Sequence, residues 1–167
     1  MNKRIVIVAL ITLILDQISK IVIESLIEYH HSVTIIKNFF KLTIVHNFGI
    51  SWGILEGKRI IIIIGTLIVM VIVYKLLQTF KSNIRNNIAF GLLIGGMLGN
   101  FIDRLFLGYV RDFLDFKIFN YNYPVFNIGD MGIVIGIILI IIAQMKKNLK
   151  YVYIKLIVKE QIRNRSN

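Results

Sequence analysis

The sequence predicts an all-α membrane protein, a bundle of four transmembrane helices with a small extracytoplasmic β-rich element between helices 1 and 2. Hydrophobic residues fill 56% of the 167 positions, and the mean hydropathy is +0.74. A soluble domain has roughly half of its residues apolar. Four apolar spans also approach the roughly 20 residues that cross a hydrocarbon core as a helix. In a single domain covering residues 1–167, these spans are about 5–26, 60–77, 88–107 and 129–145.

Lysine and arginine residues gather at one end of each span. They precede the first span, lie between the second and third, and follow the fourth. By the positive-inside rule, both termini are expected to be cytoplasmic, with a cytoplasmic tail at about 146–167. This placement explains the formal net charge of +11 without a nucleic-acid partner, so we expect no nucleic-acid binding. The residues are Lys3, Arg4, Lys75, Lys81, Arg85, Lys146, Lys147, Lys150, Lys155, Lys159, Arg163 and Arg165.

The two segments on the opposite side differ in composition. Residues of about 31–57 are rich in β-branched and aromatic side chains with partial alternation, which predicts short strands in an extracytoplasmic β-rich element. Residues of about 108–126 carry aromatic side chains that suit a membrane interface. Trp52, beside the second span, is interpreted as an interface anchor.

Polar residues collect in the half of the spans that faces away from the basic ends. At a rise of about 1.5 Å per helical residue, they lie roughly 18 to 22 Å from the inner ends of their helices. All of them therefore fall in the outer part of a hydrocarbon core about 30 Å thick. Glycines that recur every four residues along the third span predict close helix contacts around them. The polar residues are Asp16, Asn100, Asp103 and Asp130.

Two charged pairs lie inside these spans. Asp16 and Lys20 are four residues apart, the spacing of an ion pair within one helix. Such a pair can simply neutralise itself near the interface or can take a functional role, and the spacing leaves both readings open. Asp103 and Arg104, adjacent in sequence, resemble a buried structural pair.

Asp112 and Asp130 are the candidates for chemistry. One follows the third span and the other opens the fourth, so both start at the outer boundary. Two carboxylates in a partly desolvated site share a proton, and the pair can activate water while protonating a carbonyl or a leaving nitrogen. That is the chemistry of aspartic proteolysis. The alternative is that Asp112 is a solvated loop acid and that Asp130 only caps the fourth helix.

Other hydrolytic motifs are disfavoured. Residues Gly49–Gly53, GISWG, have the spacing of a serine nucleophile elbow, but no histidine follows Ser51 as that triad requires. The three histidines form no H-E-x-x-H helix, which argues against a zinc protease. The chain has no cysteine and therefore no thiolate nucleophile.

Five polar boxes follow one another along the chain. They are Asp16–Lys20 (DQISK, for D-Q-x-[ST]-K), Asn47–Ser51 (NFGIS, for N-x-G-x-[AS]), Gly95–Arg104 (GGMLGNFIDR, for G-G-x-x-G-N-x-x-D-R), Val110–Phe113 (VRDF, for V-x-D-[FY]) and Phe126–Asp130 (FNIGD, for F-N-x-A-D). In order and composition this set resembles the lipoprotein signal peptidase family, the type II signal peptidases of bacteria. The resemblance extends over nearly the whole chain.

The resemblance implies a membrane aspartic endopeptidase that removes signal peptides from diacylglyceryl-modified prolipoproteins by cleaving just before the lipidated cysteine. Asp112 and Asp130 match its catalytic pair. It further implies no metal or organic cofactor, contact with membrane lipid, binding of the peptide antibiotic globomycin, and an active site near the outer leaflet of the bacterial cell membrane. Residues matched to substrate binding or support of the site are Asn47, Gly49, Asn100, Asp103, Arg104, Asn127, Asp16 and Lys20.

Two positions depart from the family pattern. Gly129 replaces the usual alanine, and Trp52 stands where phenylalanine or another apolar residue is more frequent. Glycine at position 129 removes a methyl group beside Asp130 without affecting its carboxylate.

Carboxylates within membrane spans also fit two other classes of protein. The first is a small proton- or ion-coupled transporter that uses the intramembrane carboxylates of Asp16, Asp103 and Asp130. A transporter is expected to expose polar groups on both sides of the bilayer, whereas the inner halves of these spans are almost entirely apolar. The second is a structural assembly factor, in which the carboxylates could be neutralised without consequence.

Overall fold

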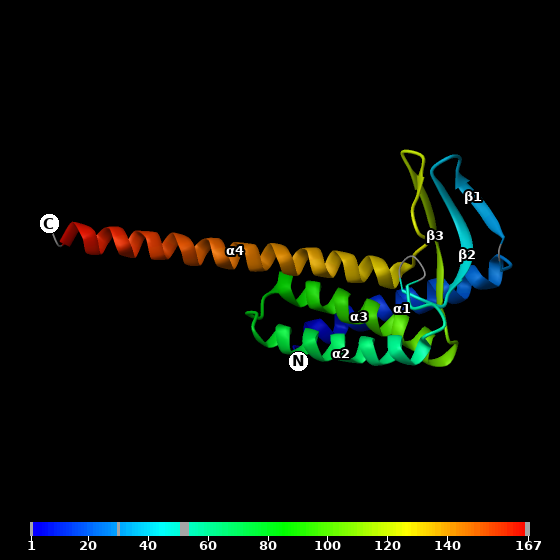
Figure 1. Cartoon of the computed structure of the whole chain (residues 1–167), viewed down its shortest axis with the longest axis horizontal. Coiled ribbons are helices and arrows are strands. Elements are labelled where there is room, and N and C mark those ends of the chain that lie inside the picture. The colour runs from blue at the N-terminus through cyan, green and yellow to red at the C-terminus, as the bar shows by residue number, and fades with distance from the viewer. Residues whose placement is uncertain (1, 30, 51–53, 166–167) are drawn as a thin grey trace.

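The computed structural model describes residues 2–29, 31–50 and 54–165. Figure 1 shows helices that run alongside one another, with a small sheet at one end and both termini away from that sheet. Ser51 and Trp52, to which the sequence assigns a box position and an interface role, lie outside the described residues. The helices of the described part are α1 (Lys3–Leu26), α2 (Arg59–Gln78), α3 (Ile84–Phe106) and α4 (Ile128–Arg165). Its strands are β1 (Ser32–Ile36), β2 (Phe40–Asn47), β3 (Val110–Ile118) and β4 (Tyr121–Asn122).

All four of these helices are long and apolar enough to cross a membrane, which fits the predicted class. Helix α3 packs against α1, α4 and, less extensively, α2. Within α2 only Ile62 and Val73 are buried, so most of its apolar side chains face outward from the bundle. The bundle is therefore built around α3, with α2 at the periphery.

The glycines of α3 allow this packing, as their spacing predicts. A Cβ atom on Gly95 would lie 2.7 Å from Cβ of Thr12 on α1. On the other face, a Cβ atom on Gly96 would overlap the carbonyl oxygen of Gly129 on α4. Since real Cβ atoms essentially never approach so closely, any larger residue here would force the helices apart.

The sheet draws on two separate segments of the chain. Its strand order is β1-β2-β3-β4, and all neighbouring pairs are antiparallel. The β-rich element predicted between helices 1 and 2 is therefore only half of the sheet, because β3 and β4 lie between α3 and α4. The residue pattern of β3 did not predict a strand, because its buried positions include the polar residues Arg111, Asp112 and Asp115.

Two helix boundaries also differ from the sequence prediction. Helix α3 begins four residues earlier than the predicted residue 88, at Ile84, because Asn83 caps it by accepting from the Asn86 backbone N–H. The fourth helix was predicted to end near residue 145, but α4 continues to Arg165. The segment 146–165 contains no glycine or proline that would end a helix, so the predicted tail begins as helix.

Candidate active site

Asp112 projects from β3 at the junction of the sheet with the helices, and its side chain is almost fully buried. Two side-chain amides donate to it. Asn47, from the end of β2, donates from Nδ2 to Oδ2 at 3.0 Å, and Asn127 donates from Nδ2 to Oδ1 at 2.6 Å. Antiparallel pairing brings Asn47 there, because β2 and β3 align Asn47 with Val110 and Val45 with Asp112.

Asp130 lies in the first turn of α4 and forms a reciprocal cap with Asn127. The Asp130 N–H donates to Asn127 Oδ1 at 2.9 Å, and the Asn127 N–H donates to Asp130 Oδ2 at 3.2 Å. Such a cap satisfies N–H groups that the helix itself leaves unpaired. The other oxygen, Oδ1, accepts from Asn100 Nδ2 at 2.7 Å. Asp130 thus shares in the predicted helix cap and also faces a polar side chain of α3.

The two carboxylates are electrostatically coupled. Burial, and then the charge of Asp130, raise the pKa of Asp112 from 3.8 to about 7, against the opposing effect of the amide hydrogen bonds. A raised pKa in one member is expected when two carboxylates share a desolvated site. Asp112 therefore holds a proton far more readily at neutral pH than an ordinary aspartate does.

A buried cation supports the far side of the site. Lys20 Nζ lies 2.7 Å from Asp16 Oδ2 and 3.2 Å from Asp103 Oδ2, and all three side chains are shielded from solvent. Lys20 Nζ also donates to Asn100 Oδ1 at 3.0 Å. Asn100 therefore accepts from Lys20 on one side and donates to Asp130 on the other. The Asp16–Lys20 pair is thus more than a self-neutralising pair at an interface.

Gly129, which stands where the family pattern has alanine, lies between Asp16 of α1 and the middle of α3. Its N–H donates to Asp16 Oδ1 at 2.7 Å. A Cβ atom at this position would lie 3.0 Å from Asp16 Oδ1 and 3.1 Å from the Gly96 carbonyl oxygen. Here the glycine leaves room for the short contact between α4 and the Asp16 carboxylate.

Arg104 connects α3 to the segment after β2. Its Nη2 donates to the Gly49 carbonyl oxygen at 2.9 Å, and the Gly49 N–H donates to Asn47 Oδ1 at 3.0 Å. Arg104 Nε is buried without a hydrogen-bond partner among the described residues. The predicted pairing of Asp103 with Arg104 is wrong, because Asp103 instead pairs with Lys20 and Arg111.

Arg111 and Gln17 belong to this network, although neither was predicted as a site residue. Arg111 Nη2 donates to Asp103 Oδ1 at 2.8 Å and to Gln17 Oε1 at 2.9 Å. Gln17 Nε2 donates to the Gly99 carbonyl oxygen at 3.1 Å. The available signal was a second charged residue directly beside Asp112, in the box Val110–Phe113.

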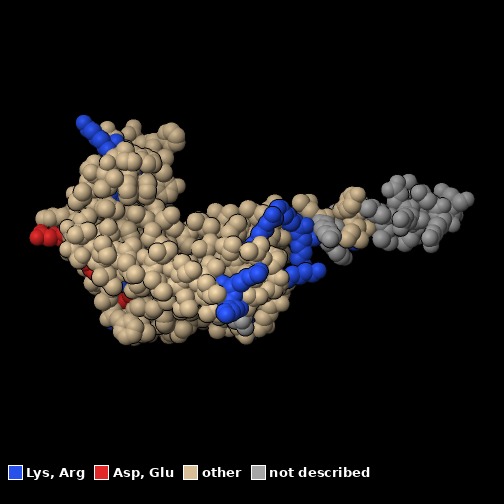
Figure 2. All heavy atoms as spheres, turned by 180° about the vertical axis from the view of Figure 1, so that it is seen from behind, with Lys and Arg blue, Asp and Glu red and all other residues tan. Residues whose placement is uncertain are grey.

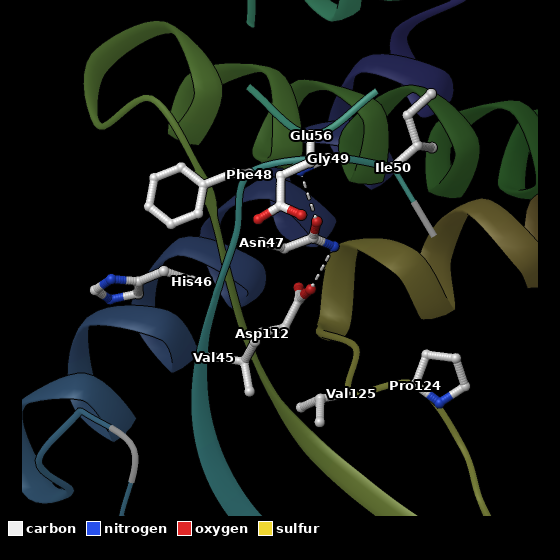
Figure 3. A pocket seen from close by; sticks show the side chains of 10 residues that line it. All are labelled: Val45, His46, Asn47, Phe48, Gly49, Ile50, Glu56, Asp112, Pro124 and Val125. Carbon is white, nitrogen blue, oxygen red and sulfur yellow. Dashed lines mark hydrogen bonds between the residues drawn. The ribbon is translucent and has the colours of Figure 1, made fainter. Parts of the chain in front are cut away.

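A pocket of about 240 Å³ opens onto Asp112. Figure 3 shows it bounded by the end of β2 and by Pro124 and Val125, with the Glu56 side chain directed toward Asn47. Its lining is mostly apolar, with Asp112, Asn47 and Glu56 among the polar groups. The part of the chain that the structure describes has no cluster of histidine and acidic side chains suited to a metal ion. The pocket therefore gives an extended chain access to Asp112 from one side, while Asp130 is not among the lining residues.

Comparison with known proteins shows the family to which this chain belongs. Residues 8–146 match the family described as signal peptidase (SPase) II. The chain belongs to the signal peptidase II family. Lipoprotein signal peptidases of Staphylococcus aureus strains JH9 and Newman are each 40% identical to it over 142 residues, covering 84% of this chain and 87% of theirs.

Two solved structures, both described as bacterial membrane enzymes, resemble this signal peptidase II. The first has a TM-score of 0.79 and 39% identity, and the match covers 86% of this chain and 88% of that one. The second has a TM-score of 0.76 and 39% identity, covering 85% and 92% of the respective chains. Four membrane-type helices and this family together indicate a bacterial membrane protein.

Proposed function

We propose that this signal peptidase II is an aspartic endopeptidase of the membrane that cleaves diacylglyceryl-modified prolipoproteins just before the lipidated cysteine. The observation that carries the proposal is the coupled pair of Asp112 and Asp130, joined through Asn127. Membership of the family and the likeness to lipoprotein signal peptidases support the substrate class. They do not favour a transporter.

In the proposed reaction, Asp130 is the ionised member and Asp112 the protonated one. Asp130 receives two N–H donors at the N-terminus of a helix, and both features favour negative charge. The pKa of Asp112, raised to about 7 by burial and by the charge of Asp130, suits a general acid at neutral pH.

A water molecule between the two carboxylates then attacks the scissile carbonyl carbon. Asp130 takes the proton of that water, while Asp112 gives its proton to the carbonyl oxygen. When the tetrahedral intermediate collapses, the C–N bond breaks and the leaving nitrogen receives a proton from the pair. The free α-amino group of the lipidated cysteine and the carboxylate of the signal peptide are the products.

The proposed orientation has the sheet and the site at the outer leaflet and both termini in the cytoplasm. Figure 2 shows basic side chains gathered around the end of the bundle from which α4 extends, away from the sheet. On that side, exposed Lys3 and Arg4 lie at the start of α1, exposed Lys81 lies between α2 and α3, and exposed Arg85 lies at the start of α3, as the positive-inside rule expects. A lipid-anchored substrate could then enter laterally with its acyl chains still in the bilayer, and globomycin is expected to bind in the same place.

Purified protein in lipid–detergent micelles, incubated with a lipobox peptide that carries a diacylglyceryl cysteine, tests this proposal. Asp112→Asn and Asp130→Asn should each lower the turnover rate by about 100-fold or more, the usual contribution of a general acid or base. Asp115→Asn is the matched control, since Asp115 is buried on the same strand but contacts Thr43 and Lys41 instead of the pair. Full turnover by Asp130→Asn, with correct membrane insertion, would disprove the assignment.

A further inference from the structure

Arg111 is the charged neighbour of Asp112 on β3. It donates three hydrogen bonds to the Asp103 carboxylate on α3. Its Nη2 donates to Oδ1 at 2.8 Å, its Nε donates to Oδ2 at 3.3 Å, and its backbone N–H donates to Oδ2 at 3.1 Å. Arg111 is 9% exposed and Asp103 is 1% exposed, so solvent competes little with these bonds. Both the backbone and the side chain of the residue before Asp112 are thereby fixed to α3.

The other member of the pair is fixed to the same helix. Asn100 of α3 donates to Asp130 at 2.7 Å, and Asn100 lies three residues, or about one turn, before Asp103. Asp112 and Asp130 are thus tied to α3 by two polar links one turn apart. Helix α3 serves as a common reference for two carboxylates that belong to different elements.

We propose that Arg111 is a positioning residue for catalysis, which sets the separation of Asp112 from Asp130 by holding β3 on α3 through Asp103. This inference rests on the proposed function, because it concerns the geometry of the same carboxylate pair. Arg111 itself touches neither the substrate nor the reacting atoms.

The need to neutralise the charge of Asp103 does not by itself explain why an arginine stands at position 111. Asp103 Oδ2 already has a buried cation 3.2 Å away, Lys20 Nζ of α1. What Arg111 adds is directional bonding on several sides at once, since its guanidinium also meets Gln17 and, at 3.5 Å, Glu24 Oε2. A planar guanidinium offers five N–H donors in a fixed arrangement, whereas a lysine ammonium is a single point of charge.

The groups around Arg111 come from every element packed against it. Helix α1 contributes Glu24 and Gln17, and α3 contributes Asp103. Strand β2 places His46 opposite Arg111, with His46 Nε2 3.1 Å from Glu24 Oε1. The start of β3 is therefore joined by side-chain bonds to α1 and α3 and by its backbone to β2.

Arg111→Lys separates geometry from charge and is the central test. With the diacylglyceryl lipobox peptide as substrate, kcat is expected to fall by about tenfold to 100-fold with KM nearly unchanged, as for a misplaced catalytic group. The alkaline limb of the pH–rate profile should move to lower pH, because a looser pair is less strongly coupled and its upper apparent pKa falls. Arg111→Met should lose at least as much kcat.

Lys117→Met is the matched control, since Lys117 is a basic residue of β3 that forms no ion pair with a described residue. It should keep wild-type kcat, KM and pH profile. The inference is overturned if Arg111→Lys shows wild-type kcat and pH profile. It is equally overturned if kcat falls only in proportion to the folded fraction, measured by thermal unfolding, with an unchanged profile. Failure of wild-type protein to cleave, or cleavage by Asp130→Asn, would instead refute the proposed function.

Discussion

Asn127 donates its side-chain amide to Asp112 at 2.6 Å while its own backbone N–H donates to Asp130 at 3.2 Å. Asn127 is fully buried. One residue therefore contacts both carboxylates and also begins the helix that carries one of them. Asn127 is thus a direct link between the two carboxylates.

Replacement of Asn127 by serine should separate its two roles. Serine caps a helix about as well as asparagine, so the stability of α4 should be largely retained. The amide donor to Asp112 is lost, however, and an unsatisfied buried partner costs about 1–3 kcal/mol, which corresponds to roughly fivefold to 160-fold in rate. Turnover of the lipobox peptide by Asn127→Ser, compared with exposed Asn122→Ser on β4, measures this effect. Wild-type turnover would show that the amide is not needed.

The raised pKa of Asp112 predicts a pH dependence of stability with a definite sign. Unfolded Asp112 loses its proton near its ordinary value of 3.8, while the folded protein holds it up to about 7. The folded state therefore binds more protons between these values, and the free energy of unfolding should decrease as pH rises from about 4 to about 7. Thermal unfolding of wild type and Asp112→Asn across this range tests it. The variant should lose part of the slope, and an unchanged slope would contradict the assignment.

The close approach of α1 to α3 makes Gly99 sensitive to the smallest substitution. A Cβ atom at Gly99 would overlap the Asp16 carboxylate, which Lys20 and the Gly129 N–H hold in place. Gly99→Ala should therefore lower the free energy of unfolding by about 1–3 kcal/mol, the usual cost of overpacking. Gly65→Ala on α2 is the control, because a Cβ atom there meets nothing within 4 Å. Equal stability of the two variants would argue against the close contact.

Loss of Lys20 should be among the most costly single changes in the bundle. Lys20→Met leaves Asp16 and Asp103 without their shared cation, and an uncompensated buried charge typically costs about 3–5 kcal/mol. Adding Asp16→Asn should recover part of that loss, since one of the two charges no longer needs a partner. Unfolding of the single and double variants measures the coupling, and exposed Lys75→Met should have no measurable effect. Strict additivity would contradict the proposed pairing.

The helices could be predicted because the membrane demands long apolar runs. The first two predicted spans differ from α1 and α2 by no more than two residues at either end. The start of α3 and the end of α4 were not predicted correctly, because polar residues continue a helix as readily as apolar ones outside the hydrocarbon core. The length of an apolar run therefore does not predict where such a helix begins or ends.

Half of the sheet could not be predicted, and the reason lies in β3. Periodicity identifies a strand when one face is apolar and the other polar. In β3 the buried positions include Arg111, Asp112 and Asp115, whose partners come from α1, α3 and β2. Most of those partners are distant in sequence, so the segment by itself has the composition of a loop.

The sequence predicted the level at which the polar residues of the candidate site lie, but not their hydrogen-bond partners. Helical depth alone indicated that Asp16, Asn100, Asp103 and Asp130 lie at one level, and the structure joins them through Lys20 and Asn127. Which amide donates to which carboxylate depends on side-chain directions that only the packed bundle fixes. Asp103 illustrates this, since its partners are Lys20 and Arg111 and not the adjacent Arg104.

The peripheral position of α2 determines which substitutions this helix can tolerate. Only Ile62 and Val73 of that helix are buried, and the side chains around them face outward from the bundle. In a saturation-mutagenesis library, α2 should accept almost any exchange among apolar residues, whereas the glycine positions of α3 should accept almost none. Homologues of equal activity would then diverge fastest along α2 and slowest where the helices touch most closely.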